Sequence, residues 1–194
     1  MSVLRYDEKP KQMVERKRYT YDEWLKVDFG DERAELIDGV IYMMAYANRR
    51  HQEIVTKMSG EMYNFLKGKP CRVYAGILAK LEASKHTEVV PDIAVVCDPK
   101  KLDSRGCKGA PDFVAEVLSP STSKKDRSIK LNAYREAGVK EYWIVDPDDN
   151  TVTAYHLKDG EYTVRTYFED DKAPIRTLPD FEFDLAIVFA DEEN

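Results

Sequence analysis

Two carboxylates lie inside two short stretches of the sequence that are otherwise apolar. Asp92 belongs to the stretch 89–96, and Glu116 belongs to the stretch 113–118. A carboxylate buried without a partner loses its hydration at a large free-energy cost, so a strand keeps one there only where something pairs with it. Two neighbouring strands with one carboxylate each would form an oxygen-rich pocket of the kind that Mg²⁺ or Mn²⁺ selects. The pair therefore predicts metal-dependent chemistry.

Strand alternation decides whether the two carboxylates can meet. Asp92 shares a strand face with residues 90, 94 and 96, and Glu116 shares one with residues 114 and 118. If the two faces coincide, the carboxylates converge. The alternative is that each is a structural carboxylate, paired with an arginine or with a backbone amide.

Three further residues have types that suit the same chemistry. Lys130 lies on the inward-facing stripe of a predicted helix, so its ammonium reaches a buried anion or extends to solvent, where Asp126 would be its surface partner. His51 lies on the inward-facing stripe of an earlier helix, and its alternative is a hydrogen-bonded core histidine. Glu35 lies on the first strand of a predicted hairpin, where half-buried glutamates are common.

The pattern of apolar residues predicts the elements that position these side chains. Asp38-Gly39 between two apolar arms predicts a hairpin over 34–44, and helical spacing over 48–67 predicts a long helix that ends before Gly68. Strands are expected at 72–82, 89–97, 112–118 and 141–145, a short helix capped by Thr20 at 19–25, a helix at 124–137, and a last hairpin at 151–157 and 162–168. The strand, helix and strand over 112–145 predict a parallel crossover.

Length and composition favour one soluble domain. At 194 residues, with 43% hydrophobic and 34% charged residues, the chain is long enough for one buried core and short for two. We expect a flexible arm at 1–18 and a single domain at 19–190. The apolar runs are too short to span a membrane and the N-terminus lacks the apolar segment of a signal peptide, so we expect a cytoplasmic protein without a membrane partner.

The charge and the cysteines exclude some other classes. A net charge of −6 argues against a dedicated, tight nucleic-acid binder, although residues 98–130 hold eight basic residues against five acidic ones. Cys71, Cys97 and Cys107 are odd in number and have no C-x-x-C spacing, so the sequence suggests neither a disulfide framework nor a zinc site. We expect three free thiols in the core.

Taken together, these motifs carry a resemblance. The order helix, three strands, helix and strand, with Pro-Asp on the second strand and glutamate on the third, resembles the core of the PD-(D/E)xK nuclease superfamily. A fuller set is similar to the Uma family of predicted restriction-endonuclease-like bacterial proteins, over about residues 19–189. These motifs are Glu35-Leu36-Ile37-Asp38-Gly39, His51-Gln52, Pro91-Asp92, Glu116-Val117-Leu118-Ser119-Pro120-Ser121-Thr122, Asp126 with Lys130, and Gly138-Val139-Lys140-Glu141-Tyr142-Trp143. The implied fold is α/β, a restriction-endonuclease-like core with additional β-hairpins at both ends.

The resemblance implies a metal-dependent phosphodiester hydrolase that acts as a DNA endonuclease. Asp92 and Glu116, with Glu35 in support, would hold Mg²⁺ or Mn²⁺. Lys130 would assist the attacking water, and His51 would hydrogen-bond a ligand carboxylate or orient the substrate. DNA is the substrate by family analogy, and nothing in the chain reads bases. The oligomeric state stays open, a homodimer included.

The sequence departs from the superfamily pattern at one position. The motif Glu-x-Lys would place a lysine at 118, where this chain has Leu118. That lysine positions or activates water and stabilises developing negative charge. Lys130, on the helix behind the same strand, is the expected substitute, and Lys80 is its rival.

Two other classes of function stay open. One is a nuclease-fold protein that has lost catalysis and serves as a binding or assembly module, which Leu118 and the acidic charge favour. The other is a metal-dependent hydrolase of a small phosphate ester, which a narrow, closed pocket would favour over a groove that admits a duplex.

Overall fold

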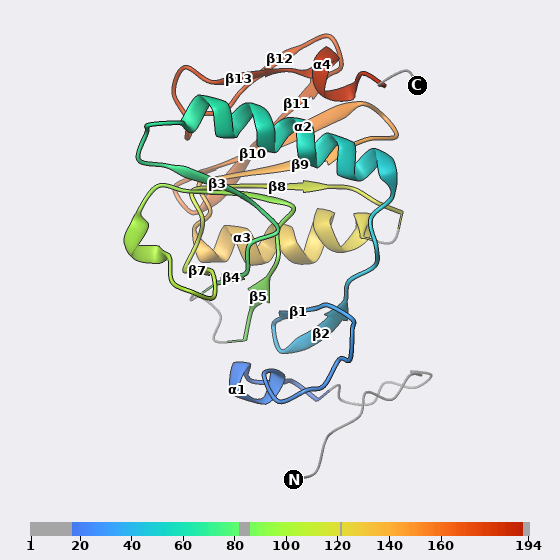
Figure 1. The fold of residues 1–194 in the computed structure, drawn as a ribbon, viewed down its shortest axis with the longest axis vertical. Helices are drawn as coiled ribbons and strands as arrows, with labels where there is room; N and C mark the ends of the chain where they lie inside the picture. The colour runs from blue at the N-terminus through green and yellow to red at the C-terminus, as the bar shows by residue number, and fades with distance from the viewer. Residues whose placement is uncertain (1–16, 82–85, 121, 192–194) are drawn as a thin grey trace.

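A six-stranded sheet forms the centre of the molecule in the computed structural model, which describes residues 17–81, 86–120 and 122–191 (Figure 1). Most of the arm predicted at 1–18 therefore lies outside the described residues. The strands in spatial order are β11 (Glu161–Phe168), β10 (Thr151–Lys158), β9 (Glu141–Asp146), β8 (Phe113–Val117), β6 (Ile93–Val96) and β3 (Arg72–Ala75). Only β8 and β9 pair in parallel; the other neighbours are antiparallel.

Helices cover both faces of this sheet (Figure 1). One face packs against α2 (Arg49–Leu66), α4 (Leu185–Phe189) and the two-stranded sheet of β12 (Lys172–Pro174) and β13 (Glu182–Asp184). The other packs against α3 (Leu131–Ala137). Residues of β8 alternate between the two cores, because successive side chains of a strand point to opposite faces. Phe113, Ala115 and Val117 join the α2 side, whereas Val114 joins the α3 side.

The crossover from β8 to β9 contains a segment wider than an α-helix. The predicted helix at 124–137 is present, but its first part is the π-helical segment η2 (Lys125–Lys130), and only the second part is α3. Gly138 ends α3 in the left-handed conformation, with φ of 84°. π-helical turns are rare and often lie at functional sites.

A second, five-stranded sheet lies beyond α3 (Figure 1). Its order is β2 (Val40–Met43), β1 (Ala34–Ile37), β5 (Glu88–Val89), β4 (Ala79–Lys80) and β7 (Cys107–Lys108). The predicted hairpin of β1 and β2 is confirmed, with Asp38 and Gly39 both at positive φ as a tight hairpin turn requires. The predicted helix α1 (Tyr21–Trp24) is confirmed with its capping box between Thr20 and Glu23.

Two predicted strands are wrong in their extent, because each is divided between the two sheets. The stretch 72–82 becomes β3 and β4, and the stretch 89–97 becomes β5 and β6. Gly76 turns the first at a φ of +69°, and Pro91 interrupts the second because it has no N–H to donate to a ladder. Asp92 therefore lies just before β6, where the two sheets diverge, and not at the centre of a strand.

The expectation of three free thiols is also wrong, since a disulfide joins Cys71 and Cys97. Arg72 pairs with Val96 in the antiparallel ladder of β3 and β6, which places the two cysteines opposite each other at its end. Spacing along the sequence does not reveal such a register. Cys107 is free and buried.

The contact between Gly106 and the backbone of Leu78 gives a test of the small sheet. A Cβ on Gly106 would lie 2.2 Å from the carbonyl oxygen of Leu78, so Gly106→Ala should lower the free energy of unfolding by about 1–3 kcal/mol. Gly60 lies exposed in α2 with open space around it, so Gly60→Ala should raise that free energy by about 1 kcal/mol. Urea unfolding of both variants measures this, and equal stabilities would contradict the described path of 106.

Candidate active site

A cavity of about 480 Å³ lies at the point where the two sheets diverge. Its lining comes from β1, the linker 44–47, α2, the turn before β6, the end of β8, and η2. All five residues predicted from the sequence line it: Glu35, His51, Asp92, Glu116 and Lys130. The fold therefore brings together side chains that span nearly a hundred positions of the chain.

Asp92 lies immediately before β6 and is held there by two hydrogen bonds. Its Oδ2 accepts from the backbone N–H of Val117 at 2.8 Å and lies 3.1 Å from Nε2 of His51. Asn48, the N-cap of α2, fixes the start of the helix that carries His51, because its side chain accepts the backbone N–H of His51 at 2.8 Å. About a quarter of the Asp92 side chain, 24%, is exposed. The predicted contact of His51 with a site carboxylate is present.

Glu116 lies opposite Asp92 and deeper in the molecule. Ile93 pairs with Ala115, so the next position of the ladder places these two carboxylates side by side. Oε1 of Glu116 accepts hydrogen bonds from the Tyr134 hydroxyl at 2.6 Å and from the Lys130 ammonium at 2.8 Å. Burial raises the pKa of Glu116 to about 8, with the charges of Asp92, Asp126 and Glu35 adding to the rise and that of Lys130 opposing it.

Lys130 points into the molecule and not to its surface. Its Nζ lies 2.8 Å from Oε1 of Glu35, 2.8 Å from Oε1 of Glu116 and 3.7 Å from Oδ1 of Asp126. Only 4% of its side chain is exposed. Burial lowers the pKa of Lys130, but the charges of Glu116, Glu35 and Asp126 outweigh burial and raise it, so the ammonium keeps its proton. The alternative of a surface pair with Asp126 is wrong, because both residues are buried.

Glu35 connects two lysines through its two oxygens. Oε1 accepts from Lys130 and from the backbone N–H of Val90 at 3.0 Å, and Oε2 accepts from the Lys125 ammonium at 2.7 Å. Burial raises the pKa of Glu35, but the charges of Lys130 and Lys125 lower it overall. Because both of its oxygens are engaged, Glu35 is better placed to hold the lysines than to be the metal ligand the sequence suggested.

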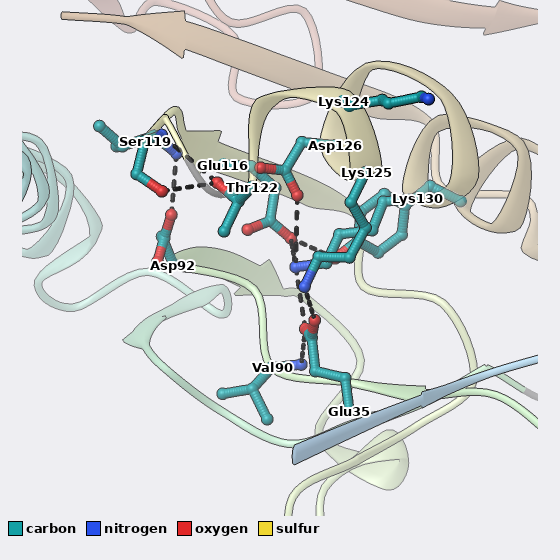
Figure 2. A network of polar contacts seen from close by, with 12 residues as sticks. Glu35, Val90, Asp92, Glu116, Ser119, Thr122, Lys124, Lys125, Asp126 and Lys130 are labelled. Carbon is teal, nitrogen blue, oxygen red and sulfur yellow. Dashed lines mark hydrogen bonds and ion pairs between the residues drawn. The ribbon is translucent and has the colours of Figure 1, made fainter. Parts of the chain in front are cut away.

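Lys125 is a site residue that the sequence did not predict. In an α-helix, positions five apart lie about 140° apart around the axis, so Lys125 and Lys130 would face different directions. A π-helix closes its hydrogen bonds five residues apart and brings such positions to the same side. Figure 2 shows both ammonium groups near Glu35, whereas Lys124 extends away from the carboxylates. The sequence pattern over 124–137 predicts an ordinary helix and does not indicate the π-helical segment.

Ionisable side chains at the cavity form an inner cluster in which negative charges outnumber positive ones. It consists of Glu35, Asp92, Glu116, Asp126, Lys125 and Lys130 (Figure 2). Four carboxylates face two ammonium groups, an excess of two negative charges if all are ionised. Burial raises the pKa of Asp126, and its buried Oδ1 has no hydrogen-bond partner in the described part of the chain. One divalent cation would balance the cluster in its fully ionised form and would oppose the rise in the pKa values of Glu116 and Asp126.

The donor set fits such an ion through two carboxylates. Among residues 17–81, 86–120 and 122–191, no three His, Cys, Asp or Glu side chains form a ready-made metal site. Mg²⁺ is commonly bound by only one or two carboxylates, with water and substrate phosphate as its other ligands. Asp92 and Glu116 would hold the ion, and Asp126 contributes negative charge behind them.

The rival lysine lies elsewhere. Lys80 lies over the ring of Tyr21 at 4.1 Å and lines a second cavity of about 100 Å³. Leu118 packs in the core on the α3 side.

Comparison with known proteins identifies the family. The model of the Uma2 family, described as a putative restriction endonuclease, matches residues 19–187. The chain belongs to the Uma2 family. An uncharacterized Synechocystis protein, slr1290, is 29% identical over 149 residues, which cover 76% of this chain and 78% of that protein. A second Synechocystis protein, sll1609, is 25% identical over 118 residues, covering 59% of this chain and 67% of its own length.

A solved structure shows the same fold. A putative nuclease of DUF820 from Anabaena variabilis matches this Uma2 protein with a TM-score of 0.75 and 22% identity, covering 88% of this chain and 97% of its own. The expected α/β restriction-endonuclease-like fold is thereby confirmed. No helix within the described ranges is long and apolar enough to cross a membrane.

Removing the central cation tests the energetics of the inner cluster. Lys130→Met leaves Glu35 and Glu116 buried without their shared partner, so the free energy of unfolding should fall by about 3–5 kcal/mol. Lys124→Met, at the exposed position just before η2, should change it by less than about 0.5 kcal/mol. Urea unfolding at neutral pH without added metal gives both values. Equal stability of the two variants would show that Lys130 does not hold the carboxylates.

Proposed function

We propose that this Uma2 protein is a divalent-metal-dependent phosphodiester hydrolase that cleaves DNA. The observation that carries the proposal is the inner cluster, in which Asp92 and Glu116 lie together at one cavity with an excess of negative charge. The family description and the nuclease fold of the solved neighbour support the same class of reaction.

Each residue of the cluster has a task that follows from its contacts. Asp92 and Glu116 would bind Mg²⁺ or Mn²⁺, which supplies charge stabilisation to the scissile phosphate and lowers the pKa of a water for in-line attack. His51 and the Val117 amide fix the orientation of Asp92. Lys130 and Tyr134 fix Glu116 from behind.

The role of Lys130 differs from the one that the family resemblance implied. A lysine that assists water must reach it, and the Lys130 ammonium is surrounded by Glu35, Glu116 and Asp126. Its raised pKa also keeps it from acting as a base. Lys130 is therefore a positioning residue in this proposal.

A second function is favoured by the shape and charge of the cavity. At about 480 Å³ it holds little more than one nucleotide-sized group, and Asp31 and Glu32 are part of its lining. Both features suit hydrolysis of a small phosphate ester better than contact with a whole duplex.

The cytoplasmic location and the homodimer stay predictions.

Metal binding should appear as a gain in stability. Mn²⁺ at 100 times its dissociation constant stabilises a folded protein by about 2.7 kcal/mol, so the melting temperature should rise with Mn²⁺ concentration. Asp92→Asn should remove most of that rise, since it takes away a ligand. Asp180→Asn, an exposed acid outside the cavity lining, should leave it intact. An unchanged response of Asp92→Asn would place the metal elsewhere.

Cleavage assays separate the candidate functions. Wild-type protein with Mn²⁺ or Mg²⁺ should cut single- or double-stranded DNA, EDTA should abolish the activity, and Asp92→Asn should reduce it by about 100-fold or more. Hydrolysis of bis(p-nitrophenyl) phosphate without cleavage of any DNA would favour the small-ester hydrolase. Binding of DNA without hydrolysis of either substrate would favour the binding module.

A further inference from the structure

The two lysines of the inner cluster differ in what they can touch. Lys130 is enclosed by three carboxylates, and 4% of its side chain is exposed. A lysine ammonium has three N–H donors, and Lys130 directs two of them at Glu35 and Glu116, each at 2.8 Å, while Asp126 lies 3.7 Å away. Lys130 lines the cavity with only this small exposed fraction, and its close contacts are with Glu35 and Glu116, so a substrate would meet those carboxylates before it.

Lys125 is placed differently. Its side chain is 13% exposed and lines the cavity, and its Nζ is 2.7 Å from Oε2 of Glu35 and 5.8 Å from the centre of the Tyr42 ring. The hydrogen bond to Glu35 uses one of its three donors. Glu35 has no exposed side-chain surface and shares its single charge between Lys125 and Lys130, so it neutralises Lys125 only in part.

These contacts anchor Lys125 without enclosing it. An ammonium that is held by one carboxylate and faces a cavity beside a candidate metal site is already positioned to accept an anion. Under the proposed function that anion would be a phosphate oxygen that arrives together with the divalent cation, since the carboxylates around the site repel an anion without one.

We infer that Lys125 is the catalytic lysine of this site, the one that contacts a non-bridging oxygen of the scissile phosphate, and that it replaces the strand lysine missing at Leu118. The inference rests on the proposed function and extends it. In the reaction, water gives up a proton to solvent and forms the new P–O bond, while the bond to the leaving oxygen breaks and that oxygen takes a proton from solvent. The Lys125 ammonium keeps its own proton while it stabilises the charge on the phosphate.

The position of Lys125 in η2 explains why the role falls to it. Lys124, its neighbour, points away from the cluster in Figure 2 and is exposed. The π-helical segment carries both lysines. Lys130 is directed into the interior, and Lys125 lines the cavity and donates to Glu35. Two adjacent lysines of identical chemistry thus provide a matched pair for an experiment.

The test compares Lys125→Met, Lys125→Arg and Lys124→Met in the full-length protein with saturating Mn²⁺. Lys125→Met should lower the single-turnover rate of DNA cleavage by roughly 10²- to 10³-fold, while the Mn²⁺-dependent rise in melting temperature is retained. Lys125→Arg should recover part of the rate because it keeps the charge, and Lys124→Met should match the wild type. If Lys125→Met does not fold, Lys125→Gln takes its place.

A binding arm keeps the inference separate from the proposed function. Thymidine 5′-monophosphate added with Mn²⁺ should raise the melting temperature of wild type and of Lys124→Met beyond the rise with Mn²⁺ alone, and this increment should be lost in Lys125→Met. If wild type cleaves no phosphodiester but shows that difference, the proposed function fails and the phosphate contact stands. If Lys125→Met cleaves as fast as wild type, or keeps the full nucleotide increment, the inference is overturned.

Discussion

The ion pairs of Lys130 are the interaction on which the site depends. One ammonium joins Glu35 of the small sheet, Glu116 of the central sheet and Asp126 of η2, so three separate elements meet at a single charge. A charge so deeply buried is tolerated only because its partners compensate the loss of hydration. This arrangement fixes the distance between the two sheets at the place where they diverge, and that opening is the cavity.

The same arrangement leaves the inner cluster with more negative charge than its two lysines can neutralise. Burial in the folded protein raises the pKa values of Glu116 and Asp126. Such a concentration of buried carboxylates opposes folding unless protons or a cation join it. Proteins keep features of this kind at functional sites, where local cost is offset by the stability of the rest of the core. Here the rest is extensive: the central sheet is packed on both faces around Phe113, Trp143 and Tyr142.

What the sequence could predict follows from whether a feature is local. The Asp38-Gly39 turn, the capping box at Thr20 and the stripe of α2 that carries His51 depend on residues within a few positions of each other, and all are present. The convergence of Asp92 and Glu116 also follows, since strand alternation carries it. The disulfide of Cys71 and Cys97 depends on the pairing of β3 with β6, which no local pattern encodes. The direction of Lys125 depends on a π-helical turn, and the α-helical period that the sequence pattern predicts does not place it at the site.

The core packing of Leu118 explains why the lysine beside Glu116 comes from the helix and not from the strand. Leu118 follows β8 with the same orientation as Glu116, and its side chain fills the core on the α3 side. A lysine at that position would leave the core a polar group to satisfy, whereas a lysine from the helix reaches the same carboxylate at 2.8 Å without opening the packing. The helix lysine is almost fully buried, however, and its close contacts are with Glu35 and Glu116, so its position suits it to stabilise these carboxylates. A single strand lysine could serve both purposes, and in the proposed mechanism they are divided between Lys130, with 4% of its side chain exposed, and Lys125, with 13% exposed.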